Sequence, residues 1–289
     1  NYFISAPYNF HLLAENATTP ICSSCILVNT TCYDVSYMFD LQAPFRKRVV
    51  IPKMGILKSK NILFFSFEPV FEDEEYYKTG FVNLNDGGST GIISGGQILN
   101  LGTFDIDQDN SFIYFGGNDG IFVLDTNENK MLSYSSRGDT ITNIFFKNKV
   151  YFTKYDETGV IVKNGDYFRT LYERIQMKNF VVTKYDVFVY LNNTGLHISK
   201  GDIVHTLSIY PFFSGLTIDA EGTVYAWWID GIYIIVINKT LELSELVRVA
   251  ELPNIGAMTF DQENNILFTM DRSLYIMKKT SAICGAGKK

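Results

Sequence analysis

The chain has 289 residues, of which 46% are hydrophobic, 15% aromatic and 19% charged, with a formal net charge of −6. An acidic chain lacks the basic surface that nucleic acid requires, so a nucleic-acid-binding role is excluded. Its apolar runs are strand-length, well below the about 18 residues of a membrane-spanning helix, so no membrane span is expected. The 23 Phe and 18 Tyr residues favour pleated, half-buried strands, so we expect an all-β protein.

The cysteines lie at the two ends of the chain, with Cys22, Cys25 and Cys32 at one end and Cys284 at the other. Cys22 and Cys25 have the spacing of a redox or zinc half-site, but the sequence has no second pair or histidine cluster to complete a zinc site. We therefore expect two structural disulfides and no metal. One of them should join Cys284 to Cys25 or Cys32.

Four Asn-x-Thr patterns mark acceptor sites for N-linked glycans, at Asn16, Asn29, Asn192 and Asn238. Four such patterns with an even number of cysteines favour an oxidising, glycosylating route. The sequence begins at Asn1 and not at an initiator Met, so we expect a processed, mature protein. The prediction is a secreted, monomeric glycoprotein of an extracellular fluid such as haemolymph.

An internal repeat is the main signal for the fold. Six segments contain an alternating strand, a polar turn, a second strand and a small residue that opens a third strand. The third strands open at Gly80, Gly120, Gly159, Gly195, Gly231 and Ser273, with spacings of 40, 39, 36, 36 and 42 residues. A period of about 40 residues with four short strands per unit is typical of a β-propeller. We therefore predict six blades of four antiparallel strands.

The sixth segment has no evident fourth strand, whereas the N-terminal part has β-rich stretches before the first blade begins. An N-terminal strand that completes the last blade would close the ring. A disulfide from Cys284 would secure this closure, and so long a crosslink stabilises a fold by about 4–5 kcal/mol. We expect one domain over 1–289, with an N-terminal extension and closing strand at 1–45. The blades are expected at 46–98, 99–138, 139–176, 177–212, 213–253 and 254–289.

Catalytic patterns are weak. Asp105, Asp107 and Asp109 imitate the start of a calcium loop, but the required Gly and Glu positions are missing. The same place in later repeats holds Asp219 and Asp261, so we interpret these residues as hairpin turns. The three histidines form no Ser-His-Asp order. We expect no enzymatic activity and no cofactor.

Aromatic residues provide the best indication of function. In a propeller, the loops from second to third strands and the loops between blades share one face, which we call the rim. Aromatic rings with a few cations on this face would suit a flat, acidic, conjugated molecule. The predicted ligand-binding residues are Tyr155, Phe212, Phe213, Trp227 and Trp228, together with Arg137, Lys178 and Arg272.

Three stretches resemble the ommochrome-binding proteins of moth haemolymph: Cys25–Asn29, Ile62–Ser66 and Ile144–Phe152. The resemblance covers the chain from about Cys25 onward, and 1–24 have no clear counterpart. It implies an extracellular carrier for tryptophan-derived pigments, which are planar, conjugated and carboxylated. Two other classes stay open: a metal-dependent propeller hydrolase of the lactonase or strictosidine-synthase type, and a secreted propeller that binds another protein.

Overall fold

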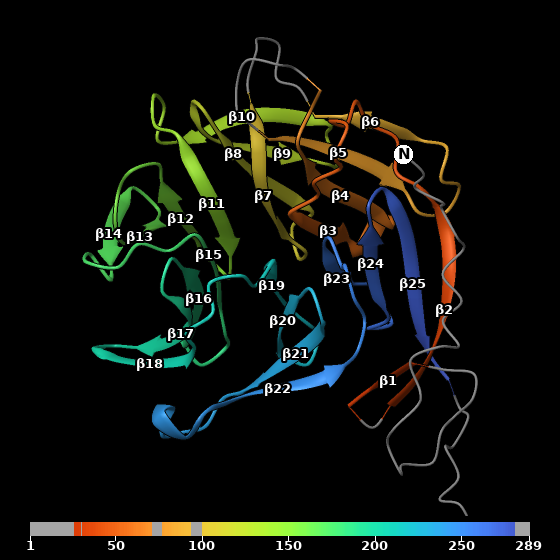
Figure 1. The fold of residues 1–289 in the computed structure, drawn as a ribbon. Helices are drawn as coiled ribbons and strands as arrows, with labels where there is room; N and C mark the ends of the chain where they lie inside the picture. Colours follow the sequence, from red (N-terminus) through yellow and green to blue (C-terminus); the bar gives the residue numbers. More distant parts are fainter. Residues whose placement is uncertain (1–25, 30, 71–76, 94–99, 281–289) are drawn as a thin grey trace, which may run out of the picture.

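The computed structural model describes residues 26–29, 31–70, 77–93 and 100–280. In these ranges the chain forms 25 strands in six sheets, which Figure 1 shows arranged radially around a centre. The helical segments in these ranges are two short 3-10 turns, η2 (Lys58–Lys60) and η3 (Leu241–Leu243). None of the described residues belongs to a helix long and apolar enough to cross a membrane. The predicted six-bladed, all-β propeller is confirmed.

The first strand of each blade lies at the centre. Each of these strands contacts the first strand of the next blade, and the last contacts the first, so the ring is closed. The six first strands are β3 (Lys53–Leu57), β7 (Leu101–Asp107), β11 (Ile141–Phe146), β15 (Asn179–Val182), β19 (Gly215–Ile218) and β23 (Met258–Phe260).

The other strands follow outward by antiparallel pairing. The second strands are β4 (Ile62–Phe67), β8 (Phe112–Gly117), β12 (Val150–Lys154), β16 (Phe188–Asn192), β20 (Val224–Trp228) and β24 (Ile266–Met270). The third strands are β5 (Lys78–Asn83), β9 (Gly120–Asp125), β13 (Val160–Asn164), β17 (Gly195–Lys200), β21 (Gly231–Val236) and β25 (Ser273–Lys279). The fourth strands of blades one to five are β6 (Thr90–Ile92), β10 (Lys130–Ser135), β14 (Tyr167–Leu171), β18 (Ile203–Ser208) and β22 (Glu245–Ala250).

The sixth blade takes its outer strand from the other end of the chain. β2 (Thr31–Asp40) pairs antiparallel with β25, with Val35 opposite Met277, and β1 (Ile26–Val28) pairs with β2. The Ser273 hydroxyl donates a hydrogen bond of 2.7 Å to the Asp40 carboxylate, which further joins the two strands. The predicted closure by an N-terminal strand is confirmed.

The aromatic composition is explained by packing between blades. Phe64 of the first blade contacts Phe104 and Phe115 of the second, with ring centroids 6.2 and 6.4 Å apart. All three rings are buried in one apolar cluster between these blades. A lone four-stranded sheet would expose such rings on both faces, whereas radial stacking removes them from water.

Two of the glycines that open third strands show why the repeat needs them. Gly195 and Gly231 have φ of 138° and 148°, which residues with a Cβ rarely adopt. A Cβ at these positions would lie 1.9 Å from the Ser208 carbonyl oxygen and 2.0 Å from that of Ala250. The end of each fourth strand therefore passes too close for any side chain.

The repeated aspartates form hairpin turns, as predicted. Asp107 accepts hydrogen bonds from the backbone N–H groups of Asp109 and Asn110 at 3.1 and 3.2 Å. Asp219 and Asp261 make the same kind of bond to the backbone of their own turns. Buried carboxylates with such partners stabilise tight turns between first and second strands.

Some predicted modification sites lie in the described ranges. Cys32 is buried in β2 and is disulfide-bonded, whereas Cys22, Cys25 and Cys284 lie outside the described residues. The backbone N–H of Thr280 donates to the Cys32 carbonyl at 3.0 Å, which places Cys32 beside the C-terminal part of the described chain. The glycan acceptors Asn29, Asn192 and Asn238 lie at strand ends or turns, and Asn16 lies outside the described ranges.

Candidate functional site

The rim of the fifth blade holds a group of stacked aromatic rings around Trp228, the last residue of β20. The rings of Tyr210 and Phe212 lie nearly parallel to it, with centroids 6.0 and 6.4 Å away and planes inclined by 18° and 17°. Phe213 contacts Trp228 at 6.0 Å in a tilted arrangement. We call these four residues the Trp228 cluster. It contains three of the predicted ligand-binding residues and adds Tyr210.

Strand alternation places the two neighbouring tryptophans on opposite sides of the sheet. Trp227 is 2% exposed, and its Nε1–H donates to the Gly256 carbonyl at 3.1 Å. Gly215 lies opposite it in β19, where a Cβ would come within 2.3 Å of the indole ring. Trp227 therefore fills the core between blades and is not available for stacking at the rim.

The Trp228 cluster presents unusual apolar area to solvent. Phe212 and Tyr210 are 65% and 55% exposed, whereas Phe213 is buried beneath them at 8%. Ile209 and Ile229, which are adjacent in sequence to Tyr210 and Trp228, are also exposed. Single exposed apolar residues are ordinary on protein surfaces, but a contiguous group of large ones marks an interaction site.

A polar network adjoins the Trp228 cluster through Phe213. The ring of Phe213 meets the edge of Tyr233 at 5.4 Å, and the Tyr233 hydroxyl donates to the Asp230 carboxylate at 2.7 Å. The same carboxylate oxygen accepts from Arg248 at 3.3 Å, and Arg248 also donates to Glu251 at 2.6 Å. Burial, followed by the bond to Asp230, raises the pKa of Tyr233 to about 12, so this hydroxyl remains a donor at neutral pH.

Arg248 is a cation that the sequence did not single out. It belongs to the fourth strand β22, and the register shift in the β21–β22 pairing sets it opposite Tyr233. Neither its charge nor its position in the repeat distinguishes it from other surface arginines. The signal lies in the side-chain contacts, which only the folded blade provides.

The other predicted residues are distributed over several blades. Arg137 pairs with Asp119 at 2.5 Å and lies over the Phe122 ring, and Arg272 pairs with Asp40 at 3.2 Å. Tyr155 is exposed in the third blade, and the backbone N–H of Lys178 donates to the fourth blade at Leu191. In the described part of the chain, no ring contact, hydrogen bond or ion pair connects these four with the Trp228 cluster. The remaining predicted residues thus do not form one site with it.

The centre of the ring holds two oppositely charged, half-buried side chains. The Lys53 amine donates to the Ile144 carbonyl at 2.9 Å, and the Asp105 carboxylate accepts from the Phe146 backbone N–H at 2.6 Å. Burial lowers the pKa of Lys53 and raises the pKa of Asp105. These contacts connect blades one, two and three. Among the described residues, no three His, Cys, Asp or Glu side chains are grouped to hold a metal ion.

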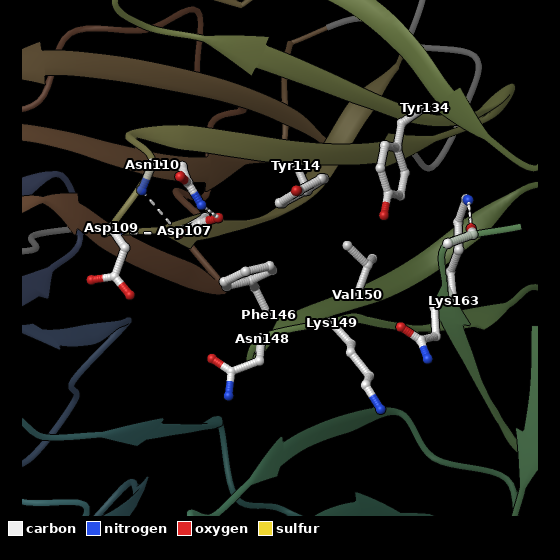
Figure 2. A pocket seen from close by; sticks show the side chains of 12 residues that line it. Asp107, Asp109, Asn110, Tyr114, Tyr134, Phe146, Asn148, Lys149, Val150 and Lys163 are labelled. Atoms are coloured by element: carbon white, nitrogen blue, oxygen red, sulfur yellow. Dashed lines mark hydrogen bonds between the residues drawn. The ribbon is translucent and has the colours of Figure 1, made fainter.

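A cavity of about 370 Å³ lies between the second and third blades, among the hairpin turns of the face opposite the rim. Figure 2 shows Tyr114 and Tyr134 on one side of it, Asn148 and Lys149 on the other, and Asp109 and Lys163 at its two ends. This cavity could not be predicted from the sequence, because its lining comes largely from turns that look like ordinary surface turns.

Comparison with solved structures supports the fold. A gluconolactonase of Xanthomonas campestris is similar, with a TM-score of 0.63, 10% identity, and coverage of 91% of this chain and 97% of that one. A virginiamycin B lyase of Staphylococcus aureus is similar at a TM-score of 0.54 and 10% identity, with coverage of 86% and 100%. At such identity the likeness concerns the fold alone.

No protein-family model matches the chain. One curated relative is the ommochrome-binding protein of Manduca sexta, which is 24% identical over 221 residues, or 74% of this chain and 78% of that protein. The similarity to the ommochrome-binding proteins that the sequence indicated is therefore confirmed.

Proposed function

We propose that this protein is an extracellular carrier that binds a planar, acidic, conjugated small molecule, such as a tryptophan-derived ommochrome pigment, at the Trp228 cluster. The observation that carries the proposal is the stack of Tyr210, Phe212 and Trp228 on the rim, in which Tyr210 and Phe212 are exposed and Trp228 is half-buried. Exposed, parallel ring faces stack on flat conjugated molecules with little loss of rotamer entropy. The relative named as an ommochrome-binding protein supports the same class of ligand.

Arg248 is the cation that we assign to the ligand's acidic group. A guanidinium has five N–H donors, and its bonds to Asp230 and Glu251 leave some of them free for a further carboxylate. Arg137 and Arg272 remain alternatives, each with its own aspartate partner and without a contact to the Trp228 cluster. The proposal therefore places the conjugated rings on Phe212 and Trp228 and the acid toward Arg248.

The direct test is titration of xanthurenate or an ommatin pigment while Trp fluorescence is recorded. Binding should quench the fluorescence of Trp228. The variants Trp228→Ala and Phe212→Ala should each bind the pigment about 10- to 100-fold more weakly, because stacking contacts of this size contribute about 1.4–2.8 kcal/mol. Tyr167→Ala is the matched control, since Tyr167 is an exposed aromatic residue on β14, away from the rim cluster. Equal affinity in the Trp228 and control variants would contradict the site.

The carrier class has an independent test. Protein purified from its native fluid should show a visible absorption band from a bound pigment. Absence of any band, together with no binding of these compounds at millimolar concentration, would contradict the carrier role itself.

Binding to another protein is a second candidate function, because Ile209 and Ile229 extend the exposed apolar area around the rings. Crosslinking in the native fluid would capture such a partner, and Phe212→Asp should abolish the capture. A partner retained by Phe212→Asp would rule out this patch as its binding surface.

We also propose that the protein is secreted as a glycosylated, disulfide-bonded monomer. The disulfide at buried Cys32 supports this proposal, as do the positions of Asn29, Asn192 and Asn238 at strand ends or in connecting segments. Peptide mapping without reduction should find Cys284 joined to Cys25 or Cys32, and a free Cys284 thiol would contradict the pairing. Treatment with a peptide N-glycosidase should lower the mass of the native protein, and an unchanged mass would contradict glycosylation.

A further inference from the structure

We infer that the cavity between the second and third blades is a second binding site, and that it takes a neutral, hydroxyl-rich ligand of the size of a mono- or disaccharide. This site is on the face opposite the Trp228 cluster and does not depend on the proposed carrier function.

The floor of the cavity is aromatic and already stacked. Tyr114 lies parallel to Phe146, with centroids 5.3 Å apart and planes inclined by 13°. The edge of Tyr134 meets Tyr114 at 5.0 Å. Because Phe146 covers a face of Tyr114, a flat aromatic ligand could not intercalate between these two rings. The C–H surface of a sugar can instead pack on an aromatic face that is only partly open.

The two phenol groups indicate hydrogen bonding to a ligand. Tyr114 is 8% exposed and Tyr134 is half-buried, yet neither hydroxyl has a hydrogen-bond partner among the described residues. Burial raises the pKa of both groups, that of Tyr114 to about 12, so both hydroxyls stay protonated at neutral pH. Both residues line the same cavity, where their hydroxyls are accessible and can bond to a ligand.

The remaining lining offers donors and acceptors in balance. The side chains of Asn110, Asn148 and Asn164 bring amides, and Asp109 and Lys149 bring opposite charges. Two carboxylates, of Asp107 and Asp109, face two amines, of Lys149 and Lys163, so the lining has no net charge at neutral pH. A hydroxyl both donates and accepts, so a polyol matches this mixed set, whereas a strongly charged ligand gains no net attraction.

The lining is also held in place before any ligand arrives. Asp107 fixes its own turn through bonds to Asp109, Asn110 and the Asn110 amide. The Lys163 amine donates to the Gly165 carbonyl and lies 5.0 Å from the Tyr134 ring centroid. Preorganised groups reduce the ordering cost of binding, and a cavity of about 370 Å³ is at the small end of the range for ligand sites.

Calorimetric titration of the protein with glucose, galactose, N-acetylglucosamine and their disaccharides tests the inference. At least one should bind saturably, and glucuronate and glucosamine should bind no more tightly than glucose. Tyr134→Phe and Asn164→Ala should each weaken binding about three- to tenfold, the effect of losing one hydrogen bond. Asn148→Gly should act similarly, because glycine keeps the left-handed backbone there, where φ is 55°.

Tyr167→Phe is the matched control, because Tyr167 is exposed on β14 and does not line the cavity. Thermal melting verifies that each variant is folded. The inference is overturned if no neutral sugar binds saturably up to about 100 mM, a limit well above the millimolar range of weak complexes. It is also overturned if both Tyr134→Phe and Asn164→Ala bind like the wild type, or if a charged sugar binds more tightly than its neutral counterpart.

Discussion

The Trp228 cluster and the cavity between the second and third blades lie at opposite ends of the propeller strands. The Trp228 cluster is apolar and built around the connection between two blades, where Tyr210 and Phe212 are exposed. The cavity is concave and polar, and its lining comes largely from hairpin turns. One scaffold thus presents two surfaces of contrasting chemistry.

The contrast follows from the kind of loop on each face. Hairpin turns need residues that tolerate positive φ, and Asn148 and Gly165 adopt φ of 55° and 60°. Turn geometry therefore makes this face polar, whatever it binds. The connection after β18 has no such constraint, so it can carry large apolar side chains. The stacked rings of Tyr114 and Phe146, and the hydroxyls of Tyr114 and Tyr134 beside them, distinguish the cavity from an ordinary set of turns.

The largest effect is expected where the rim depends on a strand glycine. Gly231 pairs with Trp228 across the turn from β20 to β21, and a Cβ there would meet the Ala250 carbonyl at 2.0 Å. Gly231→Ala should therefore lower the free energy of unfolding by about 3–5 kcal/mol, measured by chemical denaturation. Gly138→Ala is the control, since Gly138 also has positive φ but has nothing within 4 Å of a Cβ. If Gly231→Ala lowered the free energy of unfolding no more than Gly138→Ala does, the close approach of the Ala250 carbonyl to Gly231 would be contradicted.

Crossed binding measurements should separate the two surfaces. Trp228→Ala should weaken pigment binding about 10- to 100-fold and leave sugar binding unchanged. Tyr134→Phe should weaken sugar binding about three- to tenfold and leave pigment binding unchanged, because Tyr134 belongs to the second blade and the Trp228 cluster to the fifth. If either variant affects both ligands equally while its melting temperature is unchanged, the two sites are not independent.

The sequence predicted the propeller because its repeat follows local rules. Gly195 and Gly231 mark third strands, and Asp107, Asp219 and Asp261 mark turns, so strand order could be deduced without contacts. The closing strand β2 could be predicted because the sixth segment lacked a fourth strand of its own.

The sites could be predicted only in part. Phe212 lies in a loop, and Trp228 at a strand end, that the repeat assigns to the rim, so their proximity follows from topology. Trp227 was assigned to the same face, but alternation along β20 directs it into the core. The role of Arg248 and the presence of the cavity depend on contacts between side chains of different strands or blades. A repeat pattern in the sequence does not predict such contacts.

A pH effect is expected on the rim side of the fourth blade, and it should be smaller than the glycine effect. Burial lowers the pKa of His197, whose ring stacks on Tyr190 and contacts the side chains of Asn192 and Thr206 at 3.0 Å. The folded protein thus holds the neutral ring. The contribution of the neutral His197 ring to folding stability is complete above the pKa of an unfolded histidine, about 6.5, and is lost as the pH falls below that value.

Melting temperatures between pH 7.5 and 5 test this effect. The wild type should lose more stability on acidification than His197→Gln, because only the wild type must bind an extra proton on unfolding. His205→Gln on β18 is the control and should behave like the wild type. Identical pH profiles for the wild type and His197→Gln would show that this ring does not link proton binding to folding.

The smallest effect is expected at the polar cavity, where the backbone is strained but space is open. Gly165 has φ of 60°, and nothing lies within 4 Å of a Cβ built there. Gly165→Ala should therefore lower the free energy of unfolding by only about 1 kcal/mol, which is the penalty for placing alanine in the left-handed conformation. The carbonyl that accepts from Lys163 remains in this variant, so sugar affinity should change less than in Tyr134→Phe. A loss as large as that of Gly231→Ala would mean that both faces are packed equally tightly, and the distinction between a tightly packed rim and an open cavity would fail.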